Sequence, residues 1–391
     1  MKDILVIGGG KIGSVVAALL AATPESNGYR VTLADRSAAA LAPHTPDAAH
    51  RHPRLRTLVL DVGNPVALRD ALHGRFAVLS AAPYHLTLGI ARAARDAGVH
   101  YLDLTEDVAS THAIRALADG AASAFIPQCG LAPGFVSIVA ADLARRFDTL
   151  DSVRLRVGAL PAYPSNALNY NLTWSTEGVI NEYCEPCEAI VDGRVCSVPA
   201  LEEREEFSLD GVLYEAFNTS GGLGTLCDTL AGQVRTLNYR TIRYPGHAAI
   251  MKALLNDLRL RDRREVLKDL LEQALPTTTQ DVVIVFVTVA GWSDGRLQQE
   301  TYARKVYSHE LAGEVRSAIQ ITTASSLCAM LDLLAEGKLP QRGFVRQEEV
   351  ALEDFLANRF GRVYAPQDEA EQSPAYRVAR TARLKSAMTL S

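Results

Sequence analysis

The sequence lacks an excess of basic residues. Its 40 lysines and arginines are outnumbered by 45 aspartates and glutamates, which gives a formal net charge of −5 at pH 7. A balance of this kind provides no broad positive field for nucleic acid, and no polybasic segment is present to hold an anionic membrane surface. We therefore expect no nucleic-acid partner and no membrane partner.

Long apolar runs and paired cysteines are also lacking. No uninterrupted apolar stretch reaches the roughly 18 residues that suggest a membrane span. The first apolar stretch, residues 4–7, leads directly into glycines instead of a secretory pattern. Six cysteines are scattered through 391 residues and form no disulfide framework. We expect reduced thiols and a cytoplasmic protein.

What is present is an ordinary globular composition, with 48% hydrophobic and 22% charged residues, in a chain long enough for two domains. In residues 1–128, short apolar runs alternate with stretches whose apolar residues have helical spacing. The runs are 3–7, 30–34, 57–60, 76–80, 100–104 and 123–126, and the helical stretches are 13–22, 65–73 and 88–97. This alternation predicts an α/β fold, a Rossmann-type doubly wound parallel sheet with helices on both faces.

The pattern changes near residue 129, where we predict a second, α+β domain over 129–317 with a largely antiparallel sheet. Its predicted strands are 153–158, 190–198, 237–242, 282–289 and 298–306, and its predicted helices are 247–258 and 263–275. The turn 293–295 lies within an expected hairpin. A third segment, 318–391, is expected to contribute helices at 322–335 and 352–360 and to return to the first domain.

The strongest motif is G-x-G-x-x-G at residues 8–13, where Lys11 and Ile12 separate the last two glycines. It lies between a predicted strand and a predicted helix, which is the context of a dinucleotide-binding turn. Gly8 permits the tight turn, Gly10 lets the backbone approach a diphosphate, and Gly13 lets the helix pack on the strand. The positive end of that helix attracts the anion. The alternative is a glycine-rich turn that binds no nucleotide.

Asp35 ends the second predicted strand, at about the spacing of an acid that binds the adenosine ribose. A carboxylate there repels a 2′-phosphate, so the sequence favours NAD. The adjacent Arg36 can pair with such a phosphate, which keeps NADP as the alternative. The other residues expected near the cofactor follow the third and fourth strands; they are Asp61, Val62, Ala81, Ala82 and Pro83.

Acidic residues cluster after the fifth strand, at the sheet edge where the nicotinamide is expected. Asp103 and Glu106 are the candidates for the proton step that accompanies hydride transfer. Helix capping by Thr105 or Asp107 is an equally good explanation of the same cluster.

A second polar cluster contains Arg243, Tyr244 and His247. A guanidinium at a strand end can bind a carboxylate through two hydrogen bonds. From spacing alone, an internal ion pair of Arg243 and a helix-capping His247 are the simpler interpretation. Cys184 and Cys187 have C-x-x-C spacing, but no second close pair and no neighbouring histidine completes a zinc set, so we expect structural thiols and no metal.

Several ordered strings together resemble the saccharopine dehydrogenase family, in the branch of lysine 6-dehydrogenases and glutamate-forming saccharopine dehydrogenases. The matching strings are 7–13, 80–84, 130–134, 182–187, 192–193 and 241–247, and the likeness extends through 322–323 to about residue 360. The resemblance implies a Rossmann domain, an α+β domain that forms a homodimer, and a C-terminal segment that returns to the first domain.

The same resemblance implies an enzyme that oxidises the ε C–N bond of a lysine-type amino acid to the semialdehyde with a nicotinamide cofactor. It makes Arg243 a substrate-carboxylate ligand with Tyr244 beside it, and it points to Tyr170, Trp174 and Ser175 as pocket wall. The partner is thus expected to be a small amino-acid substrate.

The chain departs from the family at one position. Saccharopine-cleaving members carry an aspartate within G-L-D-P-G, whereas this chain has Ala132. The absence of this acid favours free lysine or a similar amine as the substrate. Two alternatives stay open, a carboxynorspermidine dehydrogenase-like enzyme and a non-catalytic NAD(P)-sensing protein.

Overall fold

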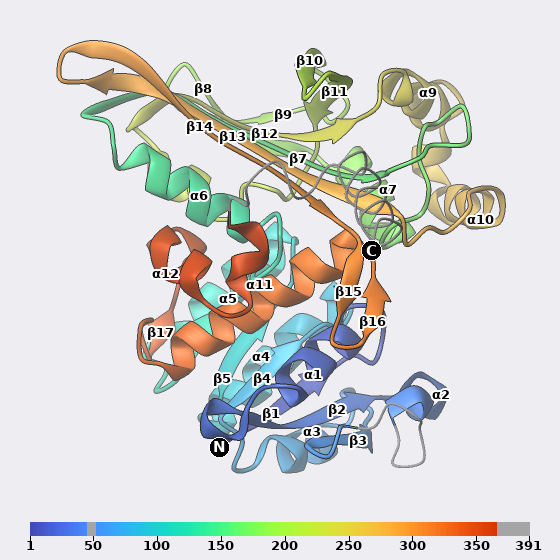
Figure 1. Cartoon of the computed structure of the whole chain (residues 1–391), viewed down its shortest axis with the longest axis vertical. Helices are drawn as coiled ribbons and strands as arrows, with labels where there is room; N and C mark the ends of the chain where they lie inside the picture. Colours follow the sequence, from blue (N-terminus) through green and yellow to red (C-terminus); the bar gives the residue numbers. More distant parts are fainter. Residues whose placement is uncertain (45–51, 366–391) are drawn as a thin grey trace, which may run out of the picture.

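The protein has two sheets with helices between them (Figure 1). The computed structural model describes residues 1–44 and 52–365. The N-terminal part forms the first sheet, and the second sheet lies across its far side. Helix α6 (Phe135–Ala144) and the C-terminal helices occupy the space between the sheets (Figure 1). The fold class predicted from the sequence is confirmed.

The first sheet contains seven parallel strands in the order β17-β6-β5-β4-β1-β2-β3. Its N-terminal strands are β1 (Lys2–Ile7), β2 (Tyr29–Asp35), β3 (Leu55–Val59), β4 (Ala77–Ser80), β5 (His100–Asp103) and β6 (Ala124–Ile126). The connecting helices are α1 (Gly13–Ala21), α2 (Ala38–Leu41), α3 (Pro65–Leu72), α4 (Tyr84–Ala97) and α5 (Val108–Ala118). Two separate apolar clusters cover the two faces, α1 on one side and α3, α4 and α5 on the other. Burial on both faces explains why these strands appear in the sequence as continuous apolar runs.

The second sheet has the order β10-β11-β12-β7-β13-β14, with β8 and β9 attached beside β12. Its strands are β7 (Thr149–Pro161), β8 (Cys187–Val191), β9 (Arg194–Val198), β10 (Glu205–Leu209), β11 (Val212–Asn218), β12 (Val234–Arg243), β13 (Asp281–Ser293) and β14 (Arg296–Tyr307). Among the described pairs β12 and β7 are parallel and the others are antiparallel. The helices of this part are α7 (Thr176–Cys184), α8 (Leu226–Leu230), α9 (His247–Lys252) and α10 (Arg264–Ala274).

Two predicted elements of this domain were wrong in detail. The single strand expected over 190–198 is a hairpin, because Asp192 and Gly193 both adopt positive φ and turn the chain between β8 and β9. The helix expected over 247–258 is α-helical to Lys252 and then becomes a π-helix over Ala253–Asp257.

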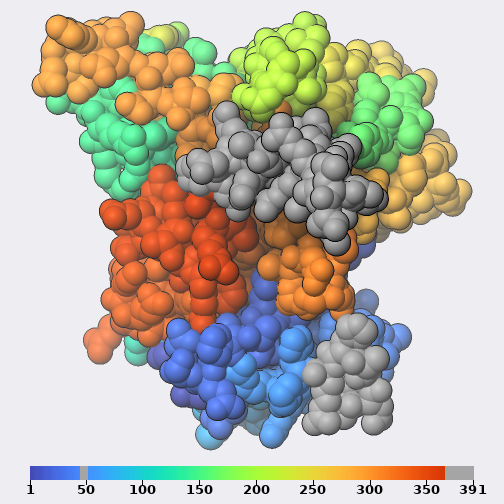
Figure 2. All heavy atoms as spheres, viewed as in Figure 1, coloured from blue at the N-terminus to red at the C-terminus, as the bar shows by residue number. Residues whose placement is uncertain are grey.

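The C-terminal segment returns to the first domain. It contains a small hairpin of β15 (His309–Leu311) and β16 (Glu314–Arg316), then α11 (Ala318–Ala335), β17 (Gly343–Phe344) and α12 (Leu352–Ala357). Helix α11 packs on α1, and β17 pairs in parallel with β6 as an edge strand of the first sheet. In Figure 2 this orange-to-red segment lies between the blue N-terminal part and the upper sheet. The remainder of the predicted third segment, residues 366–391, lies outside the described residues.

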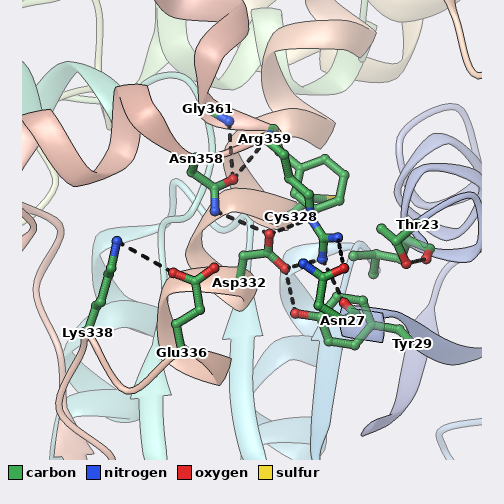
Figure 3. A network of polar contacts seen from close by, with 12 residues as sticks. Thr23, Asn27, Tyr29, Cys328, Asp332, Glu336, Lys338, Asn358, Arg359 and Gly361 are labelled. Carbon is green, nitrogen blue, oxygen red and sulfur yellow. Dashed lines mark hydrogen bonds and ion pairs between the residues drawn. The ribbon is translucent and has the colours of Figure 1, made fainter. Parts of the chain in front are cut away.

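A buried carboxylate on α11 fixes this return (Figure 3). Asp332 accepts a hydrogen bond from the Tyr29 hydroxyl at 2.6 Å and two from the Arg359 guanidinium at 2.7 and 2.8 Å. Arg359 also donates to the backbone oxygen of Asn27 at 3.0 Å. Because the Asp332 side chain is 4% exposed, these partners take the place of water as its hydrogen-bond donors. The network therefore joins the C-terminal segment to the start of β2.

Helix α11 is long and strongly apolar. In the described part of the chain it is the one helix with the length and composition of a membrane span, and 78% of that window is buried inside the fold. Its sequence also contains polar residues that are used internally, since Thr322 donates back to the Ala318 carbonyl at 2.8 Å. Helix α11 is thus a core helix of this fold.

Candidate active site

A cavity of about 680 Å³ lies between the carboxyl edge of the first sheet and the second domain. Its walls come from 10–13, 130–133 and 172–177, from residues on β7, β12, α7, α10 and the start of α11, and from Ala81, Leu104, Glu106 and Thr277. It thus combines the glycine motif, the polar cluster after β5, and the end of β12. These three features are far apart in the sequence, and the fold brings them to one site.

The glycine motif forms a turn that leaves space for an anion. Gly8 has φ +107°, and a Cβ there meets the Ala81 carbonyl oxygen at 2.7 Å. A Cβ on Gly13 meets the Gly8 oxygen at 1.9 Å, because α1 packs directly on the turn. By contrast, a Cβ on Gly10 meets nothing within 4 Å. The open backbone at Gly10, before the N-terminus of α1, fits a dinucleotide diphosphate. Lys11 and Ile12 also line the cavity.

Asp35 braces this turn. Its carboxylate accepts a hydrogen bond from the Gly9 amide at 2.7 Å and one from the Ser37 amide at 2.8 Å. The side chain therefore lies at the end of β2 against the glycine motif, where an adenosine ribose is expected. Arg36 is exposed beside it.

The remaining predicted cofactor residues occupy different environments. Ala81 lines the cavity, and its amide donates to the Ile7 carbonyl at 2.8 Å. Asp61 is exposed, and its carboxylate accepts from the Gly63 amide at 2.9 Å. Neither Asp61 nor the three other residues borders the cavity; the three are Val62, Ala82 and Pro83.

Of the two candidates for the proton step, Asp103 is a structural residue. It is buried, and its carboxylate accepts hydrogen bonds from the Tyr101 hydroxyl at 2.7 Å and from the amides of Thr105 and Gln128 at 3.0 and 2.9 Å. Burial raises the pKa of Asp103 to about 6 although these hydrogen bonds favour the ionised form. Because Asp103 does not border the cavity, we leave it out of the proposed site.

Glu106 borders the cavity directly. Burial, and to a smaller degree the charge of Asp107, raise the pKa of Glu106 to about 7. Capping of α5 falls to Asp107, whose carboxylate accepts from the Ser110 amide at 2.7 Å. The capping and proton-transfer interpretations of this cluster therefore apply to different residues. Glu106 has the location and pKa that a general base near neutral pH requires.

Arg243 enters the cavity from the end of β12 and is 2% exposed. Its Nε donates to the Tyr183 hydroxyl and its Nη1 to the Ile242 carbonyl, both at 2.9 Å. The guanidinium carbon also lies 5.1 Å from the centre of the Tyr170 ring. These contacts fix the orientation of the guanidinium, while the other terminal nitrogen, Nη2, has no hydrogen-bond partner among the described residues.

The neighbours of Arg243 were only partly predicted. Trp174 and Ser175 border the cavity, and Ser175 also caps α7 by accepting from the Gly178 amide at 3.1 Å. Tyr170 is buried behind Arg243 and does not border the cavity. Tyr244 also lies away from the cavity, with its hydroxyl donating to the Pro161 carbonyl at 3.0 Å.

His247 is buried and supports the site from behind. Its Nδ1 lies 2.9 Å from the Leu168 carbonyl, and its Nε2 lies 3.1 Å from the Tyr183 hydroxyl that Arg243 contacts. Burial, followed by the charge of Arg243, lowers the pKa of His247 to about 3. The imidazole is therefore neutral and helps to position Tyr183.

One cavity residue was not among the predicted site residues. Glu182 on α7 is 8% exposed and borders the cavity. It shares the buried side of that helix with Val179 and Tyr183. An acid at helical spacing among buried apolar residues is the signal that could have identified it.

The cysteines form no metal centre within the described ranges, where no group of three His, Cys, Asp or Glu side chains could hold an ion. All six cysteines are free. Cys187 is buried, and its thiol contacts the Glu185 carbonyl at 3.8 Å.

A dinucleotide-binding turn that faces a buried acid and a buried arginine across one cavity defines a two-domain, nucleotide-dependent oxidoreductase. Models of two domains match nearly the whole described chain, the saccharopine dehydrogenase NADP-binding domain over residues 4–126 and the saccharopine dehydrogenase C-terminal domain over 130–362. The chain belongs to the saccharopine dehydrogenase family, whose members are oxidoreductases, and its cofactor is NAD(P).

Solved structures show the same fold. The glutamate-forming saccharopine dehydrogenase of Saccharomyces cerevisiae is 18% identical with a TM-score of 0.73, over 91% of this chain and 97% of that one. The homospermidine synthase of Legionella pneumophila, solved with NAD, is 13% identical with a TM-score of 0.61, over 94% of this chain and 90% of that one.

Proposed function

We propose that this protein oxidises the ε C–N bond of a lysine-type amino acid to the semialdehyde, with NAD as the preferred nicotinamide cofactor. One observation supports this proposal above the others. Glu106 and Arg243 border the same cavity as the open backbone at Gly10. An acid–base group, a carboxylate ligand and a cofactor cradle would therefore face the same cavity.

Each residue has a distinct task in this reaction. Arg243 holds the substrate carboxylate through its remaining donors. Glu106 accepts a proton from the reacting ammonium, which frees the nitrogen lone pair to form the C=N bond as the C–H bond breaks. The nicotinamide, when bound, accepts the hydride from that carbon. Water then adds to the imine and releases ammonia, or an amino acid if the substrate is a secondary amine.

The preference for NAD is argued from Asp35. Its carboxylate is fixed at the end of β2 by the amides of Gly9 and Ser37. A fixed negative charge there binds ribose hydroxyls and disfavours a 2′-phosphate. Arg36 is the competing feature, because an exposed guanidinium can reach such a phosphate. Titration of the protein with NADH and NADPH measures the preference.

The reaction is tested with the purified full chain, both oxidised cofactors, and a panel of lysine, saccharopine, ornithine and diamines. Reduction with lysine and release of ammonia support the proposal, whereas release of glutamate from saccharopine assigns the other branch. Reduction with a diamine alone favours the polyamine-forming alternative. Tight NADH binding without any reduction favours the sensing protein.

Arg243→Ala provides the matched test of the substrate site. We expect it to abolish amine-dependent cofactor reduction and to retain NADH binding, because Arg243 contacts the second domain and not the glycine turn. Loss of NADH binding in this variant would contradict the assignment of Arg243 to the substrate and of the glycine turn to the cofactor.

We also propose a cytoplasmic homodimer formed through the second domain. The free thiols support the location, because reduced cysteines persist in the cytoplasm. Light scattering of the purified chain tests the dimer, and cell fractionation tests the location.

A further inference from the structure

An acid and a guanidinium, Glu182 and Arg243, border the cavity without forming a direct ion pair. Glu182 is buried on α7, and Arg243 is buried at the end of β12. The two groups interact electrostatically, yet no salt bridge within 4.0 Å joins them in the part of the chain that the structure describes. The nearby donors are bonded to other groups, Arg243 Nε to the Tyr183 hydroxyl and that hydroxyl to His247, and no described residue donates a hydrogen bond to the Glu182 carboxylate. An acid buried without a cationic partner is held in its neutral form, so a cation that enters the cavity beside Glu182 would allow it to ionise.

We propose that Glu182 and Arg243 together bind the α-amino-acid end of the substrate, Arg243 its carboxylate and Glu182 its ammonium group. This assignment rests on the proposed function and specifies its substrate class. An α-amino acid carries both charges on one carbon, so it fits between an acid and a guanidinium that do not reach each other. The site thereby selects an amine whose far end is a free zwitterion.

The surroundings hold the two charges apart. The Tyr183 hydroxyl and the Ile242 carbonyl occupy two nitrogens of Arg243, which restrains the guanidinium. Glu182 is carried by a helix whose neighbouring residues, Val179 and Tyr183, are buried in the second-domain core. The guanidinium is thus already oriented before a ligand arrives, which reduces the entropy cost of association.

The other charges in the cavity support a substrate with two ammonium groups. Burial, and to a smaller degree the charge of Glu106, raises the pKa of Glu182 well above its usual range, so both acids ionise fully only when cations lie beside them. Lys268 lies 3.9 Å from Glu177 at the exposed rim and does not neutralise them. Two inner carboxylates and one inner guanidinium are complementary to two ammonium groups and one carboxylate.

The same complementarity disfavours a substrate with additional carboxylates. A carboxylate attached to the reacting nitrogen would lie in the region of Glu106. Ala132 borders this cavity and supplies no charge to it. Free lysine has the charge pattern that the inner residues complement.

The test compares three amines that share a reacting end: lysine, 6-aminohexanoate, which lacks the α-ammonium, and 1,5-diaminopentane, which keeps that ammonium and lacks the carboxylate. We expect wild-type protein to oxidise lysine with a kcat/KM at least about tenfold above that for 6-aminohexanoate, as one charge-assisted hydrogen bond implies. Glu182→Gln should lower kcat/KM for lysine about 10–100-fold, mainly through KM, and change that for 6-aminohexanoate by less than about threefold.

Glu185→Gln is the matched control. Glu185 follows the same helix, is exposed, and pairs with Arg264 at 2.6 Å outside the cavity. It should leave all three substrates unchanged. If Glu182→Gln fails to fold, the wild-type preference for lysine over 6-aminohexanoate still tests the assignment. Equal kcat/KM values for those two substrates overturn it.

A binding measurement separates this inference from the proposed reaction. Lysine is titrated calorimetrically into the protein saturated with NADH. Binding that Glu182→Gln weakens, without oxidation of any amine, supports the amino-acid site and refutes the proposed reaction. Oxidation of amines with equal lysine binding by wild type and Glu182→Gln supports the reaction and refutes the role of Glu182.

Discussion

Substitution of Glu106 by Gln tests the assigned proton acceptor. The amide keeps the shape of the side chain and removes its ability to accept a proton near neutral pH. We expect kcat/KM with the preferred amine to fall about 10²–10⁴-fold, the usual contribution of a positioned acid–base group. NADH should still bind, because the loop after β5 that carries Glu106 lies two strands away from β1 and its glycine motif.

The pH profile gives the second readout. Because the pKa of Glu106 is about 7, the ionised base is lost below that pH and kcat/KM of wild type should fall about tenfold per pH unit. Glu182 interacts with Glu106, so the acidic limb reports the pair. In Glu106→Gln, the residual kcat/KM should no longer fall as the pH drops below about 7.

As the pH rises through about 7, the stability of the wild-type protein should fall while its activity rises. A carboxyl group whose pKa is raised by folding contributes stability below its ordinary pKa, and that contribution is lost as the pH rises through about 7. Glu106→Gln carries no charge, so its Tm should exceed that of wild type at about pH 8 and match it near about pH 4. Glu265→Gln, on the exposed face of α10, is the control for both measurements. A Glu106→Gln enzyme with kcat/KM within about threefold of wild type would refute the assignment.

Three further predictions concern the cofactor turn and the C-terminal segment. Gly10→Ala should fold normally and weaken NADH binding more than about tenfold, measured by titration, because its Cβ enters the space left for the diphosphate; unchanged affinity would place the diphosphate elsewhere. Asp35→Asn should lower the ratio of NADH to NADPH affinity about tenfold, and an unaltered ratio would remove Asp35 from cofactor selection. Asp332→Ala should cost about 3 kcal/mol in chemical denaturation, since it leaves Arg359 without its carboxylate, whereas the exposed Asp354→Ala should cost less than about 1 kcal/mol. Equal effects of these last two variants would contradict the importance of the network.

The first domain could be predicted closely because its local and global signals agree. The run predicted over 3–7 is β1, Lys2–Ile7, and the helix predicted over 13–22 is α1, Gly13–Ala21. Parallel strands buried on both faces contain little but apolar residues, and glycines mark their ends.

The second domain was harder because its outer strands are half exposed. Strands β10 and β11 were not predicted, since Glu205 and Glu206 begin an edge hairpin in which charged and apolar residues are mixed. Helix α7 was also missed, and with it Glu182. Its role depends on what lies opposite, which the sequence of a nine-residue helix does not contain.

The loop after β5 shows most clearly what the sequence alone could not predict. Asp103 and Glu106 are three positions apart and chemically similar, and sequence reasoning treated them alike. The fold directs one into the protein, onto the amides of Thr105 and Gln128, and the other into the cavity. The hydrogen bond that holds Asp103 comes from the Gln128 amide, 25 positions away, and the local sequence pattern cannot supply such a contact.

The pairing of β17 with β6 also bears on how the chain matures during synthesis. The strand that completes the cofactor-binding sheet is translated only after the entire second sheet. Until then β6 presents an open edge, with backbone groups available to other chains. A ribosome-bound chain that has finished its first 128 residues consequently still lacks a border of its nucleotide domain, and newly made protein should depend on chaperones most during that interval.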